Sequence, residues 1–265
     1  MRLIDIGINL MNPSFDKDRE EVVENAYRVG VAALVISGAS VKTSLEAASY
    51  IERNPDSPCG LYFSAGVHPH EANTLDDGGL ETLRGLGKSA VAIGECGLDY
   101  FRDYSPRPVQ RRCFETQLGL AADLGLPLFL HERGAFGDFS AMLKDFMPKV
   151  PAAVVHCFTG SEGELETYLD LGCHIGITGW ICDERRGQTL QGLVKKIPAR
   201  RLLLETDAPF LIPRDLGQKK VRRNEPKYLP HIAAAVARHQ GKDPIQVAEE
   251  TYANTLEFFR IECGP

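Results

Sequence analysis

The amino-acid sequence predicts a (β/α)₈ barrel, also called a TIM barrel, and three observations support this. The length of 265 residues is usual for one such barrel. Short apolar runs recur along the chain, and each begins roughly 22 to 36 residues after the one before. Helical patterns lie between these runs, and apolar strands that alternate with helices are typical of a parallel sheet covered by helices.

The apolar runs give the positions of the eight strands. In chain order they are residues 3–9, 33–38, 61–67, 91–96, 127–132, 152–157, 174–179 and 202–207. Helices are predicted where apolar residues recur at helical spacing and a glycine follows, as in the segments that end at Gly30, Gly125 and Gly172. After the eighth strand, helices are predicted near 228–240 and 244–260.

An open, doubly wound parallel sheet is the alternative architecture. It would carry a GxGxxG motif directly after the first strand, and the segment INLMNPSFDKD at residues 8–18 has none. No linker rich in Gly, Ser or Pro divides the chain. We therefore expect a single barrel domain over residues 1–265.

Charge and cysteine content argue against several classes of protein. The 30 basic and 36 acidic residues give a net charge of −6, so binding of duplex nucleic acid by bulk charge is not expected. The cysteine count of seven is odd, and no CxxC motif occurs, which favours free thiols in a reducing cytosol over disulfides or a zinc ribbon. The sequence shows no signal-peptide pattern and no apolar run long enough to span a membrane. A cytoplasmic location is expected.

Polar residues gather at the carboxyl ends of the predicted strands, where barrels of this kind hold their active sites. They are Asn9, His68, His70, Glu95, His131, His156, Glu205 and Asp207. Buried, unpaired imidazoles and carboxylates are costly, and a shared metal ion removes that cost. A lone histidine at a strand end is more often a hydrogen-bonded structural residue. Two histidines on consecutive strands, His131 and His156, flanked by carboxylates, favour a metal site instead.

Within this set, the position along each strand distinguishes the candidates. Asp207 is favoured over Glu205 because it lies nearer the mouth of the barrel, although a turn-capping role is the alternative. His68 and His70 flank Pro69, and a role in a turn is as reasonable for them as a role in the site. Alternation along the strands predicts that Cys96 and Cys157 point away from the barrel interior.

Several motifs make the sequence similar to a known family. They are GVHPH (66–70), AIGECGLD (92–99), HCFTG (156–160), IGITGW (175–180), LLLETDAPFL (202–211) and RRNEPKYLPHI (222–232). In this order they resemble the TatD family of metal-dependent deoxyribonucleases along nearly the whole chain. The resemblance implies an amidohydrolase-type barrel in which Glu95, His131, His156 and Asp207 bind metal. It also implies catalytic roles for Glu95 and Asp207, with Asp207 as general base.

Two positions depart from the family pattern. Most relatives begin the first strand with an HxH pair that holds one of two metals, and the matching residues here are Gly7 and Asn9. The sequence is therefore compatible with either one bound metal ion or two. The remaining donors are rich in carboxylates, which favours Mg²⁺, with Mn²⁺ or Zn²⁺ as alternatives. Gly134 stands where relatives often carry an acidic residue.

Basic and aromatic residues on the loops of the same face predict a surface for a phosphate backbone. The basic residues are Arg102, Arg107, Arg111, Arg112, Arg185, Arg186, Arg214, Lys219, Lys220, Arg222 and Arg223. We expect Arg112, Arg185 and Arg223 to contact phosphates. Trp180, Phe158 and Tyr100 are predicted to stack on unpaired bases, with packing beneath loops as the alternative.

Together these patterns predict a nuclease that hydrolyses phosphodiester bonds of single-stranded DNA or RNA, in DNA repair or nucleic-acid turnover. The family resemblance implies 3′→5′ exonuclease action, and we expect a monomer. One alternative is an ester or amide hydrolase such as a D-aminoacyl-tRNA deacylase. The other is a non-catalytic nucleic-acid-binding protein with a degenerate metal site.

Overall fold

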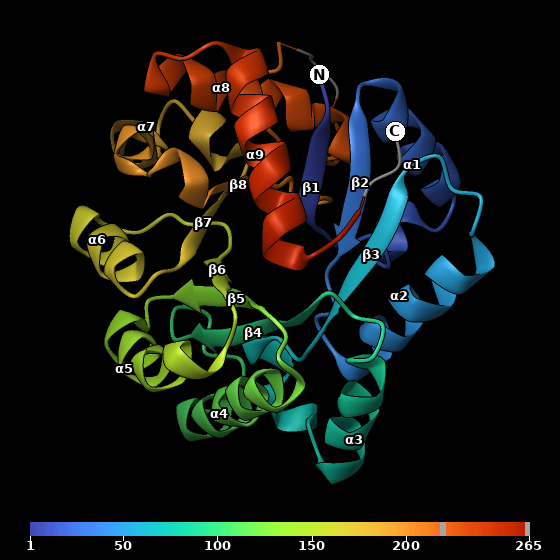
Figure 1. The fold of residues 1–265 in the computed structure, drawn as a ribbon, viewed down its shortest axis with the longest axis vertical. Helices are drawn as coiled ribbons and strands as arrows, with labels where there is room; N and C mark the ends of the chain where they lie inside the picture. The colour runs from blue at the N-terminus through green and yellow to red at the C-terminus, as the bar shows by residue number, and fades with distance from the viewer. Residues whose placement is uncertain (218–220, 263–265) are drawn as a thin grey trace.

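Eight parallel strands form the barrel in the computed structural model, which describes residues 1–217 and 221–262 (Figure 1). The strands are β1 (Leu3–Ile8), β2 (Val31–Ile36), β3 (Gly60–Ala65), β4 (Ala92–Asp99), β5 (Leu128–Arg133), β6 (Ala153–Val155), β7 (His174–Ile177) and β8 (Leu202–Leu204). Each pairs in parallel with the next in chain order. The predicted barrel and the position of every predicted strand are confirmed.

The barrel closes between its first and last strands. The Asp207 N–H donates to the Gly7 carbonyl and the Asn9 N–H donates to the Ala208 carbonyl, both at 2.8 Å. A parallel bridge joins Ile8 to Ala208. These contacts involve the residues directly after β1 and β8, so closure brings two predicted site residues, Asn9 and Asp207, to the same edge of the barrel.

Helices surround the strands as an outer ring (Figure 1). They are α1 (Arg19–Arg28), α2 (Val41–Arg53), α3 (Asp77–Leu86), α4 (Arg107–Leu124), α5 (Phe136–Phe146), α6 (Glu162–Asp170), α7 (Gln188–Leu193), α8 (Leu229–Gln240) and α9 (Pro244–Phe259). Gly125 ends α4 with a φ of 64°, a left-handed conformation that glycine adopts without strain. Gly30 follows α1 with a φ of 95°, as the sequence predicted for a helix end.

Two apolar clusters result from the alternation of side chains along the strands. Leu3, Leu128 and Leu130 point outward and pack against the helices. Ile4, Ile6 and Phe129 fill the barrel interior with neighbours from other strands. Phe258 and Phe259 at the end of α9 join this inner cluster, and the Phe258 ring contacts His174 at the start of β7. The amino end of the barrel is therefore covered, and the carboxyl end is left for the site.

Cys96, Cys113, Cys157, Cys173 and Cys182 are free thiols in the described part of the chain. Cys263 lies outside the described residues. No helix in the described part of the chain has the length and apolar character needed to cross a bilayer.

Candidate active site at the mouth of the barrel

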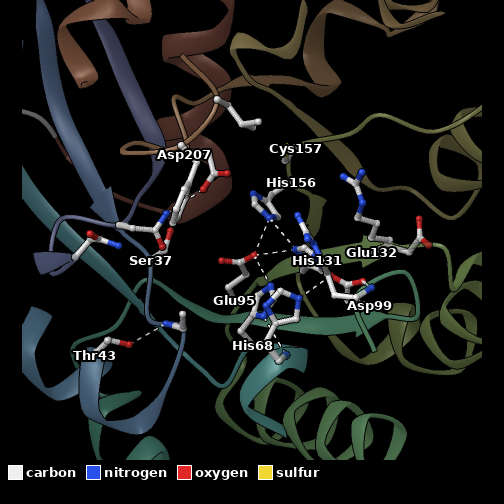
Figure 2. A pocket seen from close by; sticks show the side chains of 18 of the residues that line it. Ser37, Thr43, His68, Glu95, Asp99, His131, Glu132, His156, Cys157 and Asp207 are labelled. Carbon is white, nitrogen blue, oxygen red and sulfur yellow. Dashed lines mark hydrogen bonds and ion pairs between the residues drawn. The ribbon is translucent and has the colours of Figure 1, made fainter. Parts of the chain in front are cut away.

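A pocket of about 530 Å³ opens at the carboxyl ends of the strands. Seven of the residues predicted for the site line it, namely Asn9, His68, His70, Glu95, His131, His156 and Asp207. The eighth, Glu205, is fully buried beneath it. Figure 2 shows the side chains of His68, His131 and His156 gathered around Glu95.

The Glu95 carboxylate stands at the centre of three imidazoles. Its Oε1 atom lies 2.8 Å from Nε2 of His156, 3.0 Å from Nδ1 of His131 and 3.4 Å from Nε2 of His68. Donor atoms of His68, Glu95 and His131 lie within 4.8 Å of one another. Side chains from β4, β5 and the segments after β3 and β6 therefore converge on one point.

Close packing of β4 on β5 permits this convergence. Gly97 has a φ of 150°, and a Cβ on it would lie only 1.8 Å from the His131 carbonyl oxygen. Any larger residue would push the strands apart. The Glu95 N–H donates to the Gly38 carbonyl at 2.9 Å, which fixes the backbone from which the carboxylate projects.

Asp99, the last residue of β4, is a site residue that the sequence analysis did not single out. Its Oδ2 atom lies 2.7 Å from Nε2 of His70 and 3.5 Å from Nε2 of His131. Its Oδ1 atom accepts from the N–H groups of Phe101 and Arg102. Asp99 thus orients two imidazoles, and its signal in the sequence was its place at the end of the AIGECGLD motif.

Asp207 lies across the pocket from Asp99 and faces the first strand. Its φ of 53° turns the chain immediately after β8, and its Oδ1 atom accepts from Nδ2 of Asn9 at 2.9 Å. Burial raises the Asp207 pKa to about 7; nearby His156 opposes that shift, while Glu95 and Glu205 add to it. Asn9 therefore holds the carboxylate in place at the wall of the pocket.

Glu205 has a different environment from Asp207, although both follow β8. It is fully buried, accepts from the Cys157 N–H at 2.5 Å and lies 3.3 Å from Nδ1 of His156. A Cβ on Gly7 would lie 2.5 Å from Oε2 of Glu205. The space beside Gly7, where a histidine of an HxH pair would begin, is therefore filled by this carboxylate.

Burial and mutual charge perturb the pKa of each group in the cluster. Burial alone would raise the Glu95 pKa, but His156 and His68 hold it well below its usual value. Burial alone would lower the His156 pKa, but Glu95 and Glu205 raise it well above. Burial lowers the His68 pKa to about 4, and His131 adds to this shift. His68 is thus neutral at pH 7, the form in which imidazole binds metals.

The donor set fits a divalent cation. The Nε2 atom of His131 is buried, and its contact with Asp99 Oδ2 at 3.5 Å is too long or poorly aligned to count as a hydrogen bond, an arrangement that is costly unless a closer partner is supplied. The imidazoles of His68, His131 and His156 line one pocket with the carboxylates of Glu95 and Asp207. Neutral imidazole and carboxylate are the usual donors for Mn²⁺ or Zn²⁺, and Mg²⁺ prefers carboxylate. His68, for which the sequence left a site role and a turn role open, lies within the same group of donor atoms.

Cys157 also lines the pocket, contrary to the predicted outward orientation. The reason is that β6 ends at Val155, so alternation no longer applies at Cys157, which turns with a φ of 47°. Cys96, within β4, is buried in the outer cluster, as alternation predicted.

The residues predicted to bind substrate lie apart from this pocket. Phe158 is 3% exposed and packs in the core, which corrects the expectation of an exposed ring: it follows a strand that ends early and turns inward. Tyr100 donates its hydroxyl to Asp138 at 2.7 Å. Trp180 is half-buried, with the Arg186 guanidinium 4.6 Å above its ring.

The three arginines that were predicted to contact phosphates lie elsewhere on the protein. Arg223 forms an ion pair with Asp18 and lies 4.6 Å above the Phe15 ring. Arg112 lines a separate pocket between α4 and α5. Arg185 is exposed near Asp183 and Glu184. Lys219 and Lys220 lie outside the described residues.

Arg102, Arg133 and Phe210 are the cationic and aromatic side chains beyond the histidines that line the pocket within the described residues. Phe210 is 52% exposed. Arg102 belongs to the basic loops that the sequence singled out. Arg133 was missed because it ends β5 only two residues after His131. The sequence analysis considered only the histidine of that strand as a site residue.

Fold and site together define a hydrolase barrel of the amidohydrolase type, with histidines and carboxylates collected at the carboxyl ends of its strands. The model of the family described as "TatD related DNase" matches residues 4–260. The chain belongs to this family.

Relatives and solved structures agree with this assignment. The chain is 48% identical to the "3′-5′ ssDNA/RNA exonuclease TatD" of Rahnella sp., over 98% of this chain and 99% of that one. It is 46% identical to the protein of the same name from Cronobacter sakazakii, over 99% and 100%. A TatD family hydrolase from Entamoeba histolytica superposes with a TM-score of 0.89 at 27% identity, covering 97% and 98%. A TatD homologue from Escherichia coli K12 does so with 0.88 at 28%, covering 98% and 99%.

Proposed function

We propose that the protein is a metal-dependent exonuclease that removes nucleotides from the 3′ end of single-stranded DNA and RNA, in DNA repair or nucleic-acid turnover. The observation that carries this proposal is the convergence of His68, His131 and His156 on Glu95, in a pocket that Asp207 also lines. The names of the two bacterial relatives supply the substrate and the polarity.

Glu95, His131, His156 and Asp207 would hold the ion, with His68 as a further donor. When bound, a divalent ion polarises a phosphate oxygen and lowers the pKa of an attacking water. We propose Mg²⁺ as the ion. Because imidazole also binds Mn²⁺ and Zn²⁺ well, activity with these two ions should be compared with activity with Mg²⁺. Asn9 holds Oδ1 of Asp207 by a hydrogen bond. The other carboxylate oxygen, Oδ2, can therefore accept the proton of that water.

The shape of the pocket suits a chain end without a complementary strand. A volume of about 530 Å³ is in the range of pockets that take one small ligand. The exposed Phe210 ring can stack on an unpaired base, while Arg102 and Arg133 can pair with phosphates. All of the proposed ligands come from one chain, so we also propose that a monomer is active. The free thiols of Cys96, Cys113, Cys157, Cys173 and Cys182 support a cytoplasmic location.

A comparison of substrates tests this proposal against its two rivals. Purified protein with Mg²⁺, Mn²⁺ or Zn²⁺ is incubated with labelled single-stranded DNA, RNA, duplex DNA and D-aminoacyl-tRNA. We expect mononucleotide release from both single strands and much slower release from duplex. Faster release of the amino acid than of nucleotides would support a deacylase, and binding of DNA without turnover under all three ions would support a non-catalytic protein.

A further inference from the structure

Three potential metal donors meet on the outer side of the barrel mouth, away from the pocket described above. Cys182 ends the 3₁₀ turn η4 (Gly179–Cys182) after β7, Asp215 lies in the loop after β8, and His231 lies in the first turn of α8. Their donor atoms lie within 4.8 Å of one another. None of the three lines the candidate active site.

The three side chains form a small, half-open cluster. Cys182 is 4% exposed and forms its floor. The side chains of Asp215 and His231 are 34% and 30% exposed, with Nε2 of His231 2.5 Å from Oδ1 of Asp215. The other Asp215 oxygen, Oδ2, lies 3.8 Å from Nη1 of Arg238. One carboxylate oxygen is thus directed at the cluster, and an ion can approach from solvent.

The loops that carry these residues are already in contact. A Cβ on Gly179 would lie 2.4 Å from the Leu211 carbonyl oxygen, so only glycine permits this approach. Nε of Arg214 lies 3.4 Å from Oε2 of Glu184. Because the two loops are held side by side, Asp215 is placed near Cys182 before any ion arrives, and binding needs only side-chain adjustment.

The chemistry of the donors selects the ion. Ligand atoms about 2.0–2.3 Å from zinc lie roughly 3.3–3.8 Å apart in a tetrahedron, a separation that rotation of the exposed Asp215 and His231 side chains can reach. A thiolate and a carboxylate together balance the charge of Zn²⁺. Sulfur is a soft donor that Mg²⁺ and Ca²⁺ avoid, so this set differs in kind from the carboxylate and imidazole donors of the barrel pocket.

We propose that Cys182, Asp215 and His231 form a second metal site, which binds zinc and leaves one coordination position to water. Cys182 binds as the thiolate, and its proton passes to solvent on binding. The ion ties the loop after β8 to the loop after β7 and to α8. The loop after β8 also carries Phe210 and Leu211, which line the pocket, so the site fixes the rim around the pocket rather than taking part in hydrolysis.

Cobalt titration tests the site through its sulfur ligand. Co²⁺ replaces zinc and gives a thiolate-to-metal absorption band only when sulfur is bound. Metal-stripped protein is titrated with Co²⁺, in parallel with Cys182→Ser and Cys157→Ser; the second variant removes the cysteine that lines the barrel pocket. We expect the band in the unsubstituted protein and in Cys157→Ser, and its loss in Cys182→Ser. No band in the unsubstituted protein, or loss of the band in Cys157→Ser alone, would overturn the proposal.

Two variants at exposed side chains keep the test decisive if Cys182→Ser does not fold. Asp215→Asn and His231→Gln should each weaken zinc binding at this site by at least about tenfold, measured by competition with a chromophoric chelator, while their circular dichroism stays unchanged. Lys242→Gln, in the loop at the opposite end of α8 from His231, is the control. Zinc affinity unchanged in both variants would show that the three residues form only a hydrogen-bonded cluster.

Discussion

Oε1 of Glu95 lies 2.8 Å from Nε2 of His156, although the two residues come from β4 and the end of β6, which do not pair with each other. The contact therefore crosses the barrel mouth over β5. His131, from β5, contributes Nδ1 to the same oxygen at 3.0 Å. Residues 61 positions apart in the sequence are thus joined through one carboxylate, and the predictions below depend on this arrangement.

Asp207→Asn should lower kcat by about 10²–10⁴-fold, the usual scale for loss of a general base. The amide keeps the oxygen that faces Asn9 but cannot accept the proton of the attacking water. Calorimetric titration of metal and of a short oligonucleotide should show both still bound. Loss of metal binding would make Asp207 a ligand only, and unchanged turnover would move the basic role to another carboxylate.

Gly7→Ala should destabilise the protein by about 1–3 kcal/mol, the usual cost of overpacking. Its Cβ would lie 2.5 Å from Glu205 Oε2 and 3.0 Å from the Phe129 ring, and Glu205 is fully buried. Gly119→Ala is the matched control: it lies within α4 with no atom within 4 Å of the new Cβ and should stabilise by about 0.5–1 kcal/mol. Urea unfolding measures both, and equal midpoints for the two variants would contradict the packing argument.

His174 should make the fold sensitive to acid. Burial lowers its pKa from 6.5 to about 4, with a further contribution from Arg201, and its Nδ1 is buried without a hydrogen bond. Between pH 6.5 and 4 the unfolded chain binds a proton that the folded chain does not, so stability falls as pH falls through this window, by up to about 3 kcal/mol. Below pH 4 this loss is complete.

The His174→Gln variant isolates that contribution, because glutamine does not titrate. Its free energy of unfolding, measured by urea titration at several pH values, should fall less steeply than that of the unsubstituted protein between pH 6.5 and 4. Parallel curves over that range would assign the acid sensitivity to other groups.

Arg223 and Arg133 should separate stability from substrate binding. Arg223 pairs with Asp18, so Arg223→Ala should lower stability by about 1 kcal/mol and leave KM for oligonucleotides unchanged. Arg133 lines the pocket, so Arg133→Ala should raise KM and reduce the slope of its salt dependence by about one. The reverse pattern, seen in kinetics at several salt concentrations, would return Arg223 to the substrate surface.

Periodicity was sufficient to predict the strands, since each apolar run had to be buried on both faces of a parallel sheet. The positions of Glu95, His131 and His156 followed because the ends of such strands meet at one edge. Asp99 was missed because its place in the site comes from contacts with His70 and His131, which spacing along one strand does not reveal. For His68, the sequence left a site role and a turn role open. The surroundings of Phe158 and Arg223 were not predictable either, because loop conformation decides whether a ring or guanidinium meets solvent or a neighbour such as Asp18.

The most direct test is the single-turnover cleavage of a 5′-labelled single-stranded oligonucleotide at rising ion concentration, by metal-stripped protein and by its Glu95→Gln variant. We expect no product without added ion. With ion, the unsubstituted protein should give a ladder that shortens one nucleotide at a time from the 3′ end, at a rate that saturates. Glu95→Gln should stay inactive at ion concentrations that saturate the unsubstituted protein, because the carboxylate shared by three imidazoles has lost its charge. Cleavage by the stripped protein, internal cuts, or equal rates in the variant would contradict the assignment of a metal-dependent exonuclease site to Glu95 and its histidines.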